Sequence, residues 1–173
     1  MEFGTLAHYW NGSYKRVKGY YVSRKLNGHS AIWDGGITRG ISAKNVPWYF
    51  KGGDNEDTIS TGLWTLGRNN KPKVIKAPPE FLDKLPMYVP VHGELWLKDN
   101  LSLIKEITGR KTNSHPLWED VKFVIFNLKP YSLWKGIGYI LDLKGMPFDL
   151  VENYSYKSRM QKVKLKESGI HND

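Results

Sequence analysis

The sequence predicts an α+β fold built on antiparallel β-sheets with flanking helices. Two runs, residues 89–96 and 121–128, have the length and the β-branched and aromatic content typical of strands. An Asn-Gly pair at residues 27–28 and an Asp-Gly-Gly run at residues 34–36 are turn signals between shorter apolar runs, as in antiparallel hairpins. With 173 residues and 40% hydrophobic content, the chain can bury the core of a single domain.

The remaining elements follow from local composition. The chain is expected to be strand-rich up to residue 50, irregular from about 51 to 85 and mixed afterwards. The run at 121–128 is almost continuously apolar, which predicts a strand buried on both faces. Further expected elements are strands at 20–23 and 31–33, loops at 52–57 and 67–72, one helical turn at 81–85, and helices at 102–108 and 154–166.

Lys25 is the strongest candidate for a reactive residue. It lies between the expected strand at 20–23 and the turn at 27–28, near the tip of a hairpin. A lysine amine attacks phosphorus or a carbonyl carbon only when unprotonated, and neighbouring cations and partial burial favour that form. Arg24 is adjacent and Arg39 lies beyond the next turn. This arrangement predicts a nucleophilic lysine, whereas a plain surface lysine on a hairpin is the alternative.

The composition indicates which kinds of partner and which location to expect. The net charge of +9 favours a polyanion such as nucleic acid, although basic surfaces also occur without one. Lysines and arginines gather before Lys25, at residues 71–76 and at residues 157–166. The absence of cysteine excludes disulfides and thiolate metal sites. With no signal-peptide pattern and no apolar run of about 18 residues, we expect a cytoplasmic protein, in the host cell if a phage encodes it.

Other catalytic and metal signatures are missing from the sequence. There is no phosphate-binding loop of the Gly-x-x-x-x-Gly-Lys-Ser/Thr type, no Gly-x-Ser-x-Gly elbow and no His-Glu-x-x-His pair. The five histidines have no metal-ligand spacing, so a zinc site is not expected.

Four blocks in order resemble motifs of ATP-dependent DNA ligases of the small bacterial and phage type. YVSRKLNG at 21–28 with AIWDG at 31–35 resembles the Lys-x-Asp-Gly motif, and TRG at 38–40 resembles the Ser/Thr-Arg-x-Gly element. HGELW at 92–96 is similar to Asp-Gly-Glu-Leu-Trp, and WEDVKFVIFN at 118–127 is similar to the strand that ends in Phe-Asp. The resemblance covers about residues 18–130 and implies part of a nucleotidyltransferase fold, the adenylation domain.

The resemblance also implies residue roles. Lys25 would attack the α-phosphate of ATP, with Mg²⁺ assisting the departure of pyrophosphate, and would pass AMP to the 5′-phosphate of a nick in duplex DNA. Arg39 would contact the nucleotide or the nicked strand, Glu94 would bind the ribose hydroxyl, and Phe126 would stack on adenine. The resemblance also places Ser23 and Arg24, next to Lys25, among the residues that would bind ATP and AMP.

The sequence departs from the ligase pattern at four places, each of which removes a charge. Asn27 stands for an Asp, Ser30 for an Arg, His92 for an Asp and Asn127 for an Asp. The Arg missing at Ser30 bears on recognition of the 5′-phosphate, and the Asp missing at Asn27 bears on support of the nucleophile.

The later ligase motifs and the oligonucleotide-binding domain have no counterpart in the chain. Residues 131–173 form a basic tail in which only a Lys-x-Lys run resembles a later motif. We therefore expect one subunit of a split ligase, whose second protein chain supplies the missing motifs. A noncatalytic DNA-binding or regulatory relative is the alternative, and an RNA-joining or RNA-capping relative is a third reading.

Overall fold

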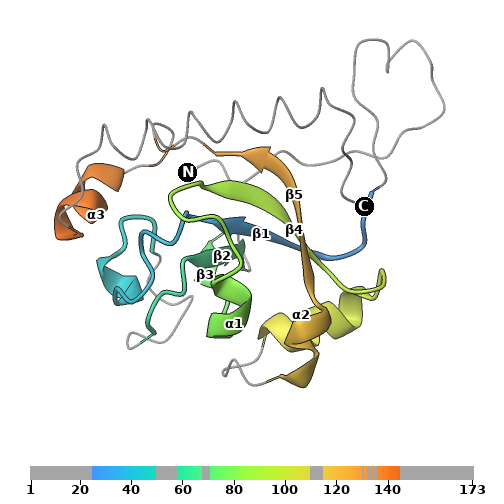
Figure 1. Cartoon of the computed structure of the whole chain (residues 1–173). Helices are drawn as coiled ribbons and strands as arrows, with labels where there is room; N and C mark the ends of the chain where they lie inside the picture. The colour runs from blue at the N-terminus through green and yellow to red at the C-terminus, as the bar shows by residue number, and fades with distance from the viewer. Residues whose placement is uncertain are drawn as a thin grey trace, which may run out of the picture.

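The computed structural model describes residues 25–49, 58–67, 71–109, 115–129, 131, 134 and 136–144. These residues form an α+β arrangement around one five-stranded antiparallel sheet (Figure 1). The order across the sheet is β3-β2-β1-β4-β5. The strands are β1 (His29–Trp33), β2 (Leu63–Leu66), β3 (Pro72–Val74), β4 (Val91–Trp96) and β5 (Lys122–Leu128).

Strand register divides the side chains between two faces of the sheet. Ala31 pairs with Gly93 and Trp33 with Val91, whereas Ile32 pairs with His92. Because directly paired residues point to the same face and neighbours along a strand alternate, Ala31 and Trp33 lie on one face and Ile32 and His92 on the other.

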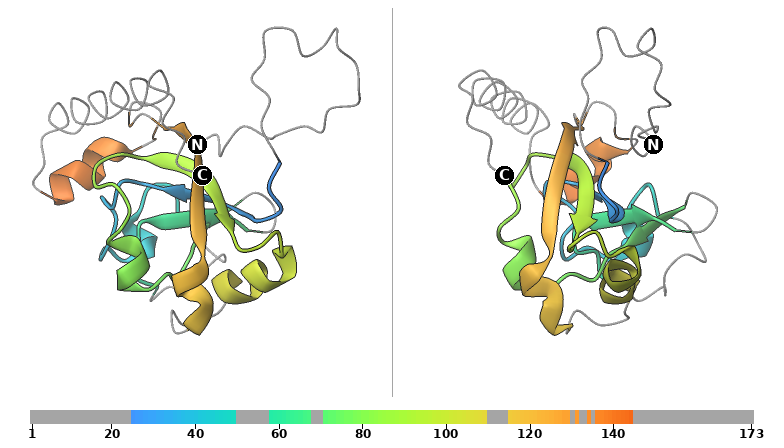
Figure 2. Two further views of the ribbon diagram at one scale, coloured as in Figure 1. Left: turned by 45° about the vertical axis from the view of Figure 1, so that its right-hand side comes forward. Right: turned by 90° about the vertical axis from the view of Figure 1, so that its right-hand side faces the viewer.

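The first face is covered by the helical elements that follow β3 and β4. These are α1 (Pro79–Leu82), α2 (Leu101–Gly109) and the 3₁₀ helix η4 (Pro116–Asp120). Figures 1 and 2 show α1, α2 and η4 together below the sheet. Their buried side chains meet the strands in one core cluster that includes Phe81, Ile104, Ile107 and Trp118.

The second face is covered over β1 and β2 by a different set of residues. The 3₁₀ helix η2 (Ala43–Asn45) and α3 (Ile137–Leu143) contribute to a second core cluster with Ile32 and Trp64 of the sheet. Tyr131 and Trp134 are buried in it, and Trp48 packs edge-on against Trp134 with ring centroids 5.0 Å apart. Packed helices thus cover both faces at the β1–β2 side of the sheet.

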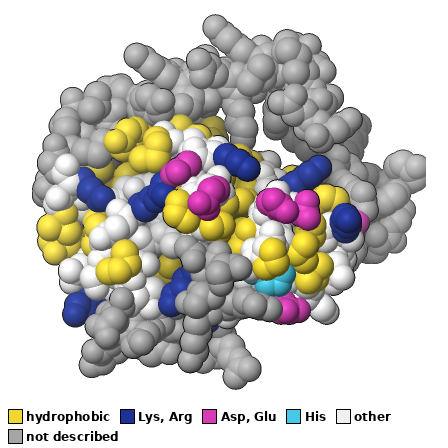
Figure 3. Space-filling view, turned by 60° about the horizontal axis from the view of Figure 1, so that its bottom comes forward, with side chains coloured by type: hydrophobic (Ala, Val, Ile, Leu, Met, Phe, Trp, Pro, Cys, Tyr) yellow, Lys and Arg dark blue, Asp and Glu magenta, His cyan; other side chains and the backbone are white. Residues whose placement is uncertain are grey.

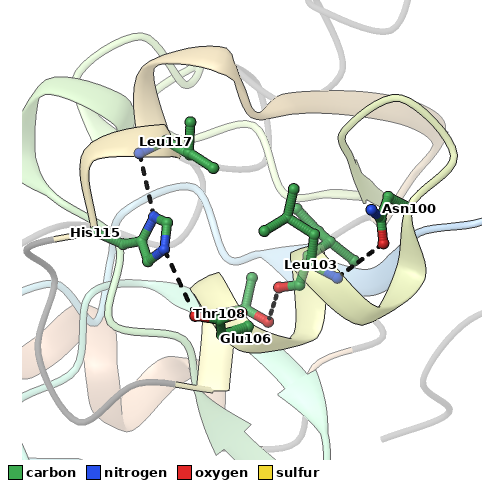
Figure 4. A network of polar contacts seen from close by, with 7 residues as sticks. Asn100, Leu103, Glu106, Thr108, His115 and Leu117 are labelled. Atoms are coloured by element: carbon green, nitrogen blue, oxygen red, sulfur yellow. Dashed lines mark hydrogen bonds and ion pairs between the residues drawn. The ribbon is translucent and has the colours of Figure 1, made fainter.

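Polar contacts hold α2 in place (Figure 4). The Asn100 side-chain oxygen accepts the Leu103 N–H at 3.0 Å, which satisfies a donor of the first turn. At the other end, Glu106 lies 4.0 Å from His115, whose Nδ1 accepts the Leu117 N–H at 3.2 Å. The approach of Glu106 to His115 thus brings the end of α2 close to η4.

Several expected elements are confirmed. The strands at 31–33, 89–96 and 121–128 correspond to β1, β4 and β5, and the turn at 34–36 follows β1. The helical turn at 81–85 corresponds to α1, and the helix at 102–108 corresponds to α2. The expectations at 20–23, 52–57 and 154–166 lie outside the described residues.

Two expectations about element positions are wrong. The stretch 51–85, expected to be irregular, contains β2 and β3, and β3 includes Pro72, a residue that sequence reasoning treats as a strand breaker. β3 is at the edge of the sheet, where a residue without an N–H is tolerated. Between residues 25 and 49, β1 is the single named strand, because the chain continues through turns and η2.

The expected burial of residues 121–128 on both faces is also wrong. β5 is the other edge strand, and Phe126 is 49% exposed. The face of β5 that carries Phe123 and Ile125 packs on the first cluster. The apolar character of the opposite face is therefore not explained by burial within the described residues.

None of the helices in the described ranges is long and apolar enough to cross a membrane.

Candidate functional site

Three strands bring the candidate residues onto the second face, beside the second core cluster. Ser30 on β1 pairs with Glu94 on β4, and Glu94 pairs with Val124 on β5. His92 shares this face because it lies two residues before Glu94. We call these residues, together with Phe126, the site face: Ser30, His92, Glu94, Val124 and Phe126.

Glu94 connects the segment that carries Lys25 to β4. Its Oε1 accepts the Gly28 N–H at 2.5 Å. A Cβ on Gly28 would collide with the Leu95 carbonyl oxygen and lie 2.8 Å from Glu94 Cγ, so this close approach requires glycine. Lys25, three residues earlier, is exposed. The partial burial expected for this lysine is therefore not provided by the described part of the chain.

Asn27 makes a second connection, to the turn after β4. Its N–H donates to Asp99 Oδ1 at 3.3 Å, and its side-chain Nδ2 donates to the Asp99 carbonyl oxygen at 3.2 Å. Trp96 Nε1 also donates to Asp99 Oδ1, at 2.5 Å. Sequence reasoning did not identify Asp99, although Lys-Asp-Asn one residue after a strand is a turn signal.

Ser30 and His92, two of the positions that depart from the ligase pattern, contact each other. Ser30 Oγ lies 3.1 Å from His92 Nε2. Burial, together with the positive charge of Lys129, lowers the pKa of His92 from 6.5. The pair is therefore neutral at pH 7. The ligase pattern has an Arg and an Asp at these two positions.

Phe126 stands out from the sheet because of a bulge. His92 pairs with Asn127 and Gly93 pairs with Ile125, which leaves Phe126 as the extra residue of β5. Its ring lies edge-on to His92, with centroids 6.0 Å apart. An exposed aromatic ring beside a hydrogen-bonded polar pair is a surface on which a base can stack.

The structure does not bring Arg39 to the site face. Lys25 precedes β1 and Arg39 follows the turn at its other end. The Arg39 guanidinium is 2.6 Å from Asp83 at the end of α1, and its carbonyl oxygen accepts from Lys144 Nζ at 2.9 Å. Ser23 and Arg24 lie outside the described residues.

A separate polar network is buried behind the turn after β1. Thr38 Oγ1 and Trp64 Nε1 both donate to Asp34 Oδ2, the latter at 3.0 Å. Ser60 Oγ lies 2.6 Å from Thr38 Oγ1. Burial raises the pKa of Asp34 to about 6, against the hydrogen bonds from Thr38 and Trp64, which lower it. The other carboxyl oxygen is buried without a hydrogen-bond partner.

Charge on the face that carries α1 and α2 is mixed. Figure 3 shows acidic side chains next to lysines and arginines there, with apolar side chains between them. The described residues of this face therefore do not form a surface of one charge sign, which binding of a polyanion favours. Within the described ranges, no group of three His, Asp or Glu side chains is placed to hold a metal ion.

A scan against models of known protein families finds no match to this chain, and a search of curated proteins finds no similar sequence.

Proposed function

We propose that this chain is the nucleophile-bearing subunit of an ATP-dependent DNA ligase, acting with a second chain that supplies the later motifs. The observation that carries the proposal is the hydrogen bond from Gly28 to Glu94. It ties the Lys25 segment to the strand next to Phe126, on one face of one sheet. In this proposal the sheet is part of a nucleotidyltransferase fold, and adenine stacks on Phe126.

The proposed step is nucleophilic substitution at phosphorus. The Lys25 Nζ lone pair attacks the α-phosphorus of ATP, an N–P bond forms, and the P–O bond to pyrophosphate breaks. The amine proton leaves to solvent. In this proposal the exposed Lys25 amine reaches a nucleotide lying across the site face, and Mg²⁺ would be bound mainly through the phosphates and water. In the next step an oxygen of the 5′-phosphate of nicked duplex DNA attacks this phosphorus, a P–O bond forms, the N–P bond breaks, and Lys25 leaves as the amine, which takes up a proton from solvent.

Three features support a requirement for a partner chain. Lys25 is exposed, so the water exclusion that favours phosphoryl transfer has to come from another surface. Phe126 is half exposed, and a bound base alone covers one side of a ring. Arg39 pairs with Asp83 away from the site face, so in this proposal the phosphate contact expected of Arg39 comes from another residue.

A noncatalytic DNA-binding protein derived from a ligase is the second candidate. The observation that favours it is the combination of a neutral Ser30–His92 pair with a Glu94 carboxylate already engaged by Gly28. The first feature removes the Arg and Asp charges that the ligase motifs have at these two positions, and the second leaves one Glu94 carboxylate oxygen occupied by Gly28.

Intact-protein mass spectrometry after incubation with ATP and Mg²⁺ tests the proposal, with and without extract of the cell that makes the protein. We expect a mass increase of one AMP, mapped to Lys25 and lost in Lys25→Ala. Lys84→Ala, which removes another exposed lysine, is the matched control and retains the adduct. AMP transfer or nick sealing that survives Lys25→Ala would contradict the ligase proposal.

If the wild type takes up no AMP under any condition and binds nicked DNA as well as Lys25→Ala does, the noncatalytic candidate is favoured. Comparing nicked DNA with nicked RNA duplexes as substrates distinguishes an RNA-joining relative.

A further inference from the structure

The segment before β1 is joined to the turn after β4 by a pair of hydrogen bonds that involves both backbone and side chain. Asn27 uses its N–H and its Nδ2, and Asp99 uses its carboxylate and its carbonyl oxygen. The two residues are 72 positions apart in the chain. Together with the Gly28 contact to Glu94, these bonds fix the backbone next to Lys25 at three points.

The chemistry of this contact defines which residue it needs at position 27. The Asp99 carbonyl oxygen can only accept a hydrogen bond, so the group that faces it at 3.2 Å must be a donor. The amide of Asn27 provides that donor. An ionised aspartate at this position has no proton to donate and would place a negative oxygen against the carbonyl oxygen.

The turn that presents Asp99 has an unusual backbone. Lys98 and Asp99 have φ values of 49° and 53°, in the left-handed region that residues other than glycine seldom adopt. Such strain persists where surrounding contacts determine it. Here the contacts are the hydrogen bonds that Asp99 accepts from Asn27 and from Trp96 Nε1.

We propose that Asn27 and Asp99 form a clamp that positions the Lys25 segment, and that the amide of Asn27 is essential to it. Asn27, where the ligase motif has Asp, is then not a lost function but a residue matched to the Asp99 turn. Both are positioning residues. The clamp itself stands on the contacts described above, whereas its effect on AMP transfer rests on the proposed function.

Amide hydrogen exchange of the full-length protein tests the clamp without reference to activity. We expect the Gly28 amide to exchange about tenfold faster in Asn27→Asp and in Asp99→Ala, because each loses at least one hydrogen bond of the clamp. Asp99→Asn retains an oxygen acceptor and is expected to stay close to the wild type. The Ile32 amide in the centre of β1 reports whether each variant is folded.

Lys98→Gly is the matched control for backbone strain, because it relaxes a positive φ in the same turn and leaves both clamp residues in place. We expect the Gly28 amide of Lys98→Gly to exchange at the wild-type rate. Unchanged Gly28 exchange in folded Asn27→Asp and Asp99→Ala would overturn the proposal, as would equal acceleration in Lys98→Gly.

The rate of AMP transfer provides the second readout. We expect Asn27→Asp to lower it about tenfold and Asp99→Asn to restore most of the rate lost in Asp99→Ala. A rate in Asn27→Asp at or above that of the wild type overturns the positioning role. If the wild type takes up no AMP at all, the proposed function fails, and the exchange measurement decides the clamp alone.

Discussion

Glu94 on β4 holds Gly28 in the segment before β1 through a 2.5 Å hydrogen bond that joins residues 66 positions apart. Glu94 is only partly buried, and its carboxylate provides the acceptor for a backbone N–H that packs directly against β4. In the proposed ligase chemistry this carboxylate would also meet the ribose. Structural and binding roles therefore fall on the same side chain, and substitutions have to separate them.

Glu94→Ala and Glu94→Gln make that separation. Alanine removes the acceptor and is expected to lower the free energy of unfolding by about 1 to 2 kcal/mol. Glutamine keeps an oxygen acceptor and is expected to lose less than about half of that. Urea unfolding at pH 7 measures both. Equal stability of the wild type and Glu94→Ala would show that the Gly28 contact contributes nothing.

Phe126→Ala tests the exposed ring of the β5 bulge. Because half of the side chain is in water, we expect a stability loss of less than about 1 kcal/mol. Binding of a nonhydrolysable ATP analogue, measured by calorimetry, is expected to weaken about tenfold through loss of stacking. Tyr139→Ala removes a ring of α3 that is 54% exposed and serves as the control. Equal affinities of Phe126→Ala and the wild type would exclude stacking on this ring.

Asp34→Asn is expected to change how stability depends on pH. In the folded protein Asp34 keeps its proton up to a pKa of about 6, against 3.8 for an aspartate carboxyl in water. Between these values the folded state binds more protons than the unfolded state, so wild-type stability falls as pH rises. From pH 4 to pH 6.5 the free energy of unfolding of Asp34→Asn should therefore rise relative to that of the wild type, by at most about 3 kcal/mol.

Thermal unfolding of both proteins across this pH range gives the difference, with Asp120→Asn, which alters an exposed carboxyl, as the baseline. A constant difference between Asp34→Asn and the wild type would show that Asp34 does not titrate in this way.

His92→Gln tests a pH dependence of stability that has the opposite sign to that of Asp34→Asn. Burial and Lys129 lower the pKa of folded His92 from 6.5, so the unfolded state binds a proton that the folded state excludes. Wild-type stability contributed by neutral His92 is thus lost as pH falls below about 6.5. We expect the wild type to weaken relative to His92→Gln between pH 7 and pH 5.

Ser30→Ala is the control for His92, because it removes the hydrogen-bond partner without removing a titratable group. Its stability difference from the wild type should vary less with pH than that of His92→Gln. Parallel pH profiles of His92→Gln and the wild type would contradict the expected sign.

The sequence by itself determined the elements whose signals are local. β1, β4 and β5 follow from apolar runs between turn residues, and α2 follows from helical spacing that ends at Gly109. These local signals were also sufficient to place Glu94 and Phe126 on strands. β2 and β3 gave weak local signals, because one is four residues long and the other three with a proline.

Only the tertiary structure decided which of these residues meet. The bulge that leaves Phe126 unpaired depends on how β5 is registered on β4. The Asn27 contact to Asp99 and the Arg39 ion pair with Asp83 join residues 72 and 44 positions apart. Hydrophobic periodicity reports which way a side chain faces along its own strand or helix, but contacts across a sheet depend on strand order and register, which the packing of both cores fixes.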